Sequence, residues 1–429
     1  MKKHLIIATL TFFITATANA QFFDKALKKM KDKAKEKFDA IGGESSQTQD
    51  NQVKTEKEQP TNSVVQNAEL LEEQGGIKAY SRYDFLPGSK IIYYENFEHG
   101  VLGELPEGWN GSGKGELVTL DKYPGKWLRL FPGTKYLSGN KHSLGENYTI
   151  EFDLILQGTP PSGTRFLPDL SLGLFASERK SPTDNVFLDP LVQVNNQATI
   201  LLKPNVDEIS RVKLICKGKD NIQTYSSENQ LIAPYGKSLN RIAHYAIQVH
   251  GQRLRLWVNE VKLLDMPKVI NANVPLNQLF FNPLEYWPYN DDNFGLYVSN
   301  LKIASGQPDN RSKLSAVGKF STTGILFESG SSQILPYSAG VLKDIALLLG
   351  EQPGLKLKII GHTDQDGEAA KNLELSRQRA TAVKANLVTD YKIDPLRLET
   401  DGLGETKPLN QVVTADAKAQ NRRVEFLRL

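Results

Sequence analysis

Cysteine is nearly absent from this chain of 429 residues, which contains only Cys216. A single cysteine excludes an intramolecular disulfide, so the fold cannot depend on one. Cys216 closes the apolar alternating run 212–216, a pattern that is typical of a strand. We therefore expect a buried, unreactive thiol at this position.

Neither sign of charge is in excess, and long apolar runs are missing. Lysine and arginine number 52 against 49 aspartates and glutamates, which gives a net charge of +3. A balance so close to neutral gives no support for binding nucleic acid through its phosphates. The apolar run 5–17 is shorter than the roughly 20 residues that a spanning helix needs, and no later run replaces it.

Residues 1–20 have the pattern of a secretory signal peptide. Lys2 and Lys3 precede the apolar run, and Ala18-Asn19-Ala20 forms a small-x-small cleavage site. We expect cleavage before Gln21, with an uncleaved anchor as the alternative. Because no cysteine lies at this site, we expect no lipid anchor of the bacterial lipoprotein type.

Residues 21–41 predict a basic amphipathic helix, and residues 42–79 predict a flexible linker. Seven lysines surround apolar residues at helical spacing, namely Phe23, Leu27, Met30, Ala34, Phe38 and Ile41. Such a helix lies on a membrane surface or against a partner, or else is simply solvated, and both interpretations stay open. The linker is polar and poor in aromatic residues, so it has little apolar surface to bury.

Residues 80–306 predict an all-β antiparallel sandwich. Short alternating runs occur at 126–130, 148–154, 294–298 and 301–303, and proline and glycine punctuate the region. The runs 253–258 and 261–264 flank Asn259-Glu260, which predicts a hairpin. The region resembles jelly rolls of the concanavalin and laminin-G type, without a sharp motif.

After a linker at 307–319, residues 320–429 predict a layered α/β domain. Strands are expected at 324–327, 355–360, 396–401 and 422–429. Helices are expected at 339–349 and 369–389. Alternating strands and helices are typical of a sheet with helices packed on it.

One loop and one helix of this domain place opposite charges near each other. Asp364 follows the strand 355–360, at the kind of edge where α/β proteins bind ligands. Arg379 and Asn372 lie seven residues apart on the helix 369–389, about 20° apart around its axis. A zwitterion would place its ammonium on Asp364 and its carboxylate on Arg379 and the first amides of the helix. Alternatively, Asp364 caps this helix or pairs with Arg379.

The same residues resemble the signature of OmpA-like C-terminal domains. The resemblance rests on Gly361-His362-Thr363-Asp364, on Asn372-x-x-Leu375-Ser376-x-x-Arg379-Ala380-x-x-Val383, on Gly402-x-Gly404-Glu405 and Pro408, and on Asn421-Arg422-Arg423-Val424. It implies that Asp364 and Arg379 hold diaminopimelate of the peptidoglycan stem peptide, with Asn372 and Arg423 at secondary positions. Glu328 departs from the family in being followed by Ser329-Gly330.

Neighbouring residues of the motif have plainer roles in this interpretation. We assign His362 to packing and Asp366 to the turn that it makes with Gly367.

An enzyme in the β-rich region is not expected. The strand motif Glu-x-Asp-x-x-Glu of laminarinase-type hydrolases is broken here, because Leu156 replaces the second glutamate after Glu151 and Asp153. We expect these two carboxylates to lie on the solvent face of an ordinary strand. The glycines 111–115 lack the length of a phosphate-binding loop, and no metal or cofactor motif is present.

Aromatic residues offer a possible glycan site in the β-rich region. Tyr286, Trp287 and Tyr289 form a candidate loop, and Asp291 and Asp292 follow it. The loop binds a sugar, or calcium through these oxygens, or is merely anchored by its rings. We expect three other tryptophans, Trp109, Trp127 and Trp257, to be buried.

Together these patterns predict a non-catalytic protein of a Gram-negative envelope, in the periplasm and associated with the outer membrane. Its predicted partners are peptidoglycan, a polysaccharide or outer-membrane protein on the sandwich, and the membrane surface through residues 21–41; no cofactor or nucleic acid is expected. Three other classes remain as alternatives: an outer-membrane barrel, a flagellar stator component and a polysaccharide hydrolase.

Overall fold

The computed structural model describes residues 83–429, apart from residue 163 and the segments 233–237, 286–288 and 307–309. These residues belong to one compact unit, Tyr80–Leu429. The predicted signal peptide, basic helix and linker lie outside the described residues. Within the described part, every helix is too short or too polar to cross a membrane.

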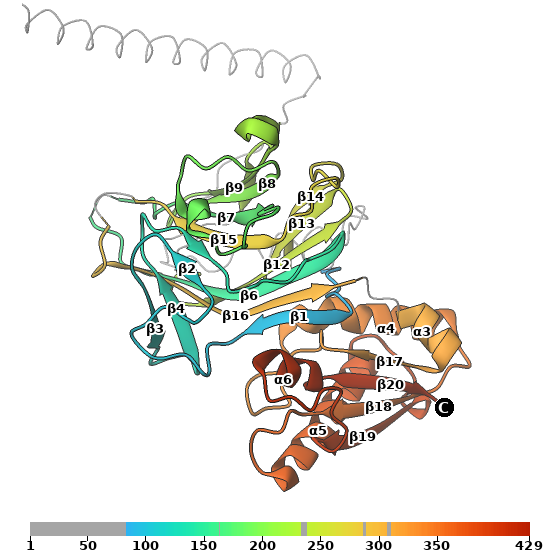
Figure 1. Ribbon diagram of the computed structural model, residues 1–429. Helices are drawn as coiled ribbons and strands as arrows, with labels where there is room; N and C mark the ends of the chain where they lie inside the picture. The colour runs from blue at the N-terminus through green and yellow to red at the C-terminus, as the bar shows by residue number, and fades with distance from the viewer. Residues whose placement is uncertain (1–82, 163, 233–237, 286–288, 307–309) are drawn as a thin grey trace, which may run out of the picture. The chain divides into compact units, whose positions relative to one another are not determined.

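The β-rich region consists of two antiparallel sheets of eight strands each (Figure 1). The first sheet has the order β14-β13-β12-β6-β16-β4-β3, with β1 also paired to β16. Its strands are β1 (Lys90–Glu95), β3 (Gly115–Thr119), β4 (Lys126–Leu130), β6 (Asn147–Gly158), β12 (Ile242–His250), β13 (Arg253–Val258), β14 (Val261–Met266) and β16 (Phe294–Ser305).

The second sheet has the order β10-β9-β8-β7-β15-β5-β2, with β11 also paired to β9. Its strands are β2 (Asn110–Gly111), β5 (Tyr136–Leu137), β7 (Leu170–Phe175), β8 (Gln197–Lys203), β9 (Ser210–Lys217), β10 (Gln223–Ser226), β11 (Gln230–Ile232) and β15 (Gln278–Pro283).

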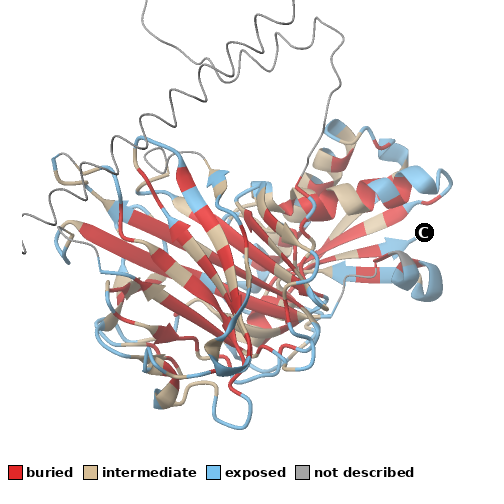
Figure 2. Ribbon diagram, turned by 90° about the horizontal axis from the view of Figure 1, so that it is seen from above, coloured by how far each residue is buried: buried red, intermediate tan, exposed pale blue. Residues whose placement is uncertain are grey.

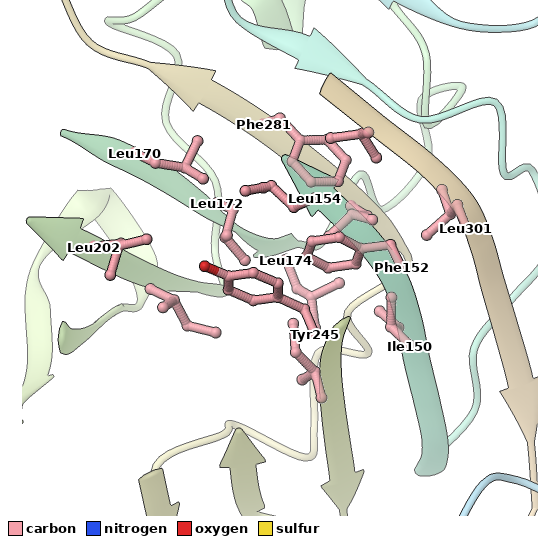
Figure 3. Close-up of a cluster of buried hydrophobic side chains, with 14 of the residues drawn as sticks. Ile150, Phe152, Leu154, Leu170, Leu172, Leu174, Leu202, Tyr245, Phe281 and Leu301 are labelled. Atoms are coloured by element: carbon pink, nitrogen blue, oxygen red, sulfur yellow. The ribbon is translucent and has the colours of Figure 1, made fainter. Parts of the chain in front are cut away.

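The core of the sandwich forms between these sheets because alternate residues of each strand point inward. Ile150, Phe152 and Leu154 of β6 meet Leu172 of β7 and Phe281 of β15 in one buried cluster (Figure 3). The rings of Phe152 and Tyr245 stack with centroids 5.1 Å apart. The antiparallel sandwich is thus as the sequence predicted, while its identity as a jelly roll stays a prediction.

Several local predictions for the sandwich are confirmed. The hairpin β13–β14 turns at Asn259, whose φ of +53° suits asparagine. Cys216 and the three tryptophans expected in the interior are buried. The runs 294–298 and 301–303 lie in one strand, β16, whose pairing with β6 is irregular between Ser299 and Lys302.

The C-terminal region is a four-stranded sheet with the order β17-β20-β18-β19. Its strands are β17 (Lys319–Thr322), β18 (Leu357–His362), β19 (Leu398–Gly404) and β20 (Val424–Arg428), and its helices are α4 (Ala339–Glu351), α5 (Ala369–Thr389) and α6 (Ala415–Asn421). Only β18 and β19 run parallel. Residues of α4 and α5 pack on this sheet in a common buried cluster. Figure 2 shows in red the buried residues on the helices and strands of the chain.

Three expectations about this region are corrected. The predicted strand 324–327 forms only an isolated bridge from Phe327 to Ile334, and the edge strand is instead β17. Part of the predicted linker forms the helix α3 (Asn310–Val317), which places Leu314 in the core. Helix α6 was not predicted, because its sequence is mostly alanine and polar residues without an apolar period.

The outer face of the first sheet is covered, which affects the charged residues on it. Tyr83 and Phe85, from the segment before β1, cluster with Trp257 of β13, and Tyr337 of the 3-10 turn η4 (Pro336–Ser338) packs against them. The ring of Tyr337 also stacks on His244 of β12, with centroids 4.2 Å apart. Side chains that point away from the sandwich core here therefore do not meet solvent.

Candidate functional site

Asp364 lies in the loop that follows β18, and both of its carboxylate oxygens are engaged. Oδ1 accepts the N–H of Asp366 at 3.2 Å. Oδ2 forms an ion pair with Arg422 at 2.5 Å, and the Asp364 side chain is only 12% exposed. The N-cap of α5 is Glu368, so Asp364 neither caps that helix nor pairs with Arg379.

Arg379 on α5 is half-buried, and some of its N–H donors are not used in hydrogen bonds. Its Nε donates to the Ser331 carbonyl at 2.9 Å, and its guanidinium lies 4.9 Å from the ring centroid of Phe327. Among the described residues, its terminal nitrogens have no hydrogen-bond or ion-pair partner. Burial, and then the charge of Arg422, hold the pKa of Arg379 below the usual arginine value, while Asp364 acts in the opposite direction. Arg379, Arg422 and Asp364 are therefore within electrostatic reach of one another.

Close packing brings α5 down onto the strands that carry the loop. Gly361 of β18 faces the Ser376 backbone, and a Cβ on Gly361 would lie 2.1 Å from the Ser376 carbonyl oxygen. Gly402 of β19 similarly leaves room for the backbone of Arg377, 2.4 Å from where a Cβ would be. Only glycine permits this approach, which fixes the height of Arg379 above the end of the sheet.

Asn372, a predicted secondary ligand residue, holds the loop to the helix. Its Nδ2 donates to the Asp366 carbonyl at 3.0 Å and to a carboxylate oxygen of Glu405 at 2.7 Å. The residue is buried in the first turn of α5. These contacts explain how the loop keeps its conformation, and a direct role of Asn372 with a ligand stays a prediction.

Arg423, the other predicted secondary residue, is saturated by the protein. It is 4% exposed, and its nitrogens donate to Glu425 at 2.7 Å and to the carbonyls of Lys407 and Asn421. A ligand would have to displace these buried bonds, so the contacts do not favour the predicted role.

Sequence reasoning missed the adjacent Arg422, which is the residue that meets Asp364. The alternation of side chains along β20 could have indicated this role of Arg422. Val424 and Phe426 face the helices, so a residue two positions before Val424 tends to share that face with Arg379, whereas Arg423 shares the other face with Glu425.

His362 and Asp366 have the structural surroundings that the sequence suggested. The His362 side chain is 1% exposed and lies 3.6 Å from Glu425. This contact, opposed by burial and aided by Arg423, lowers the pKa of Glu425 to about 2. Asp366 precedes Gly367, whose φ is +95°, and it pairs with Lys418 of α6 at 2.8 Å.

A second cluster of charges lies on the outer face of the sandwich. Glu151 of β6 pairs with Lys302 of β16 at 2.9 Å, and Asp153 contacts His244 at 2.8 Å. Glu151 is 3% exposed, so the prediction of an ordinary solvent face is wrong. The sequence placed Glu151 and Asp153 on the correct face of β6, away from the sandwich core, but Tyr337 and the segment before β1 cover this face.

The position of Leu156 separates this cluster from hydrolase geometry. Leu156 is buried in the sandwich core, whereas Glu151 points to the opposite face of β6. A glutamate at residue 156 would therefore face away from Glu151, and two carboxylates on opposite faces cannot flank one glycosidic bond.

The candidate glycan loop is described only in part. Tyr286 and Trp287 lie outside the described residues. Tyr289 donates to the Phe166 carbonyl at 2.9 Å and packs edge-on against Phe294. Asp291 pairs with Lys114 at 3.2 Å, so a cation of the protein already faces its carboxylate.

The C-terminal region matches a known family and several relatives. The OmpA family matches residues 326–422. The probable lipoprotein YiaD of Escherichia coli is 41% identical over 102 residues, which are 24% of this chain and 46% of that protein. Outer membrane porin F of Pseudomonas aeruginosa is 35% identical over 101 residues, which are 24% of this chain and 29% of the porin.

Among solved structures, the peptidoglycan-associated lipoprotein of Burkholderia pseudomallei is 27% identical, with a TM-score of 0.24 and coverage of 28% of this chain and 97% of that one. This chain spans less than half the length of the two curated relatives. Neither the family nor these relatives carries the name of an enzyme. Residues 326–422 form an OmpA family domain.

Proposed function

We propose that this chain is a non-catalytic protein of the cell envelope that binds peptidoglycan through residues 320–429. The observation that carries the proposal is the placement of Arg379, with unused donors, beside the Asp364–Arg422 pair in an OmpA family domain. A half-buried guanidinium without an acidic partner of its own is an attractive position for an added carboxylate.

The ligand that fits this arrangement is the free zwitterionic end of diaminopimelate in the stem peptide. Its carboxylate binds Arg379 through paired N–H donors, and the unpaired first amides of α5 favour the same charge. Glu368 makes no capping bond to those amides through its side chain. The ligand's ammonium binds Asp364, whose oxygens have lone pairs left beyond the bonds to Asp366 and Arg422.

The rest of the chain has its own roles in the proposal, which place the binding domain in the cell envelope. In the proposal, residues 1–20 direct export and residues 21–41 touch a membrane or a partner. The linker 42–79 then leads into the sandwich, 80–306, which is a second domain of jelly-roll type. The protein resides in the periplasm and links the cell wall to the outer membrane or to a partner of the sandwich. Binding involves no chemical step.

The proposal is tested by retention of the protein on purified peptidoglycan sacculi. We expect Asp364→Ala and Arg379→Ala each to lose most retention, because each removes one half of the site for a zwitterion. Circular dichroism and thermal unfolding check that both variants remain folded.

Matched controls come from the same helix. Lys371 and Glu374 are exposed on α5, and within the described part of the chain they bond only to neighbours on or just before this helix, Glu368 and Gln378 respectively. Lys371→Ala and Glu374→Ala remove the same types of charge and should bind like the wild type. Wild-type retention by the double variant of Asp364 and Arg379 would disprove the assigned site.

A further inference from the structure

Strand β1 of the sandwich contacts helix α6 next to the candidate site. The N–H of Tyr94 donates to the Asp416 carboxylate, and Gln420 donates to the Ile91 carbonyl at 3.2 Å. Ala419 packs against Ile91. Two of these contacts use the backbone of β1 and the third uses Ile91, so they hold α6 in place independently of the Tyr94 ring.

The Tyr94 ring has a separate role, because the guanidinium of Arg422 lies over it. The centre of that guanidinium is 5.2 Å from the ring centroid. The Tyr94 hydroxyl donates to Asn300 of β16 at 3.2 Å, which fixes the ring from its far end. Arg422 in turn pairs with Asp364. A continuous set of contacts therefore leads from the sandwich to the carboxylate that is proposed to bind the ligand's ammonium.

Arg422 needs such support because of its surroundings. Arginine has a long side chain with considerable rotamer freedom, and a guanidinium stacks favourably on an aromatic ring. Arg379 lies within electrostatic reach and carries the same charge. Repulsion between the two would favour an orientation of Arg422 away from the site unless the ring and Asp364 hold it.

We propose that Tyr94 is a positioning residue of the peptidoglycan site, and that it acts by holding Arg422 against Asp364. The inference rests on the proposed function and adds a contribution of the sandwich to it. With Arg422 fixed, Asp364 keeps one orientation for the ammonium of the ligand, and the positive charge of Arg422 adds to that of Arg379 in attracting the carboxylate. The entropic cost of ordering the site on binding is then smaller.

The test is a titration of the full chain on sacculi of the diaminopimelate type. We expect Tyr94→Ala to raise the half-saturating concentration about fivefold, the range of a partly desolvated cation–π contact. Tyr94→Phe keeps the ring and should stay within about twofold of the wild type. Tyr123→Ala removes a ring from another part of the sandwich, where its hydroxyl contacts the Asn240 carbonyl, and should not change binding.

A double-mutant cycle separates positioning from a general effect on the fold. In an Arg422→Gln background, Tyr94→Ala should cause no further loss, because the ring then has no guanidinium to hold. A loss that persists undiminished in that background would overturn the inference. So would wild-type affinity of Tyr94→Ala, or tighter binding, which would mean that Arg422 competes with the ligand's ammonium.

The same titration distinguishes this inference from the proposed function. If the wild-type protein is not retained at all, the proposed function fails and the inference fails with it. If the wild type is retained and Asp364→Ala is not, while Tyr94→Ala equals the wild type, only the inference fails.

Discussion

The two charged clusters of this molecule differ in how completely the protein satisfies them. On the outer face of the sandwich, the carboxylates of Glu151 and Asp153 meet the cations of Lys302 and His244, under cover of Tyr337. At the end of β18, Asp364 pairs with Arg422, while Arg379 nearby has no ion pair among the described residues. The first cluster is balanced and closed, and the second has a spare cation with unused donors.

This difference separates a structural role from a binding role. Buried charges that already have partners resist the approach of a ligand, because new contacts would have to replace strong ones. An unbalanced, partly exposed group gains from a ligand of opposite charge. Asn300 connects the two clusters, since it donates to Asp153 at 2.8 Å and accepts from Tyr94.

The largest expected effect comes from disrupting the cluster on the outer face of the sandwich, which contains Glu151 and Lys302. Glu151→Ala leaves the buried Lys302 without its partner and removes one of the two carboxylates that face His244, and we expect the free energy of unfolding to fall by about 3–5 kcal/mol. Urea denaturation measures this. The control is Glu116→Ala, which removes a partly exposed pair with Arg129 and should cost less than about 1 kcal/mol. Equal losses in both variants would show that the cluster is not structural.

Alkaline pH should weaken the same cluster. Burial alone would lower the pKa of His244, but hydrogen bonds to Asp153 and Glu151 outweigh it and raise the pKa to about 9. The folded state therefore holds this proton more tightly than the unfolded chain does. The added stability is fully present below pH 6.5 and is lost as pH rises towards 9, by on the order of 3 kcal/mol. Urea unfolding at pH 6 to 10 measures it, and His244→Gln should flatten the dependence.

Adding a side chain where α5 packs on β18 should lower the stability by a smaller amount and should also weaken binding at the site. Gly361→Ala places a methyl group against the Ser376 carbonyl, and we expect a loss of about 1–3 kcal/mol together with weaker retention on sacculi. Gly354 lies in the turn before β18, where an added Cβ meets nothing within 4 Å. Gly354→Ala is thus the control, and unchanged stability in both variants would contradict the packing described here.

The smallest expected effect is a loss of stability at low pH. Glu425 has its pKa lowered to about 2 by His362 and Arg423, against the opposing effect of burial. Its contribution is present above the unfolded value of 4.5 and is lost as pH falls towards 2, by about 1 kcal/mol for a partly exposed group. Thermal unfolding between pH 5 and 2 should show this slope in the wild type and a reduced slope in Glu425→Gln.

Local patterns in the sequence were enough for much of the fold. The helix 369–389 has the predicted bounds, and the hairpin around Asn259 forms as predicted, because periodicity and turn chemistry act over neighbouring residues. The loop with Asp364 and the helix with Arg379 were also placed correctly relative to the strand before them.

Contacts between distant segments explain what the sequence did not reveal. No alternation pattern indicates that Tyr337 stacks on His244, or that Tyr94 lies under Arg422, since the members of each pair are far apart in the sequence. The ion pair of Asp364 with Arg422 was likewise not predicted, and Arg422 is the C-cap residue of a helix, α6, that was not predicted either. Such partners are determined by tertiary packing.

The central claim is that Asp364 and Arg379 together recognise a group bearing both charges. The most direct measurement is binding of the wild-type chain to two peptidoglycans in parallel, one with diaminopimelate and one with lysine in the stem peptide. Lysine offers the ammonium without the neighbouring carboxylate, so we predict binding to the lysine type that is weaker by about tenfold or more. Equal binding to both would contradict the account.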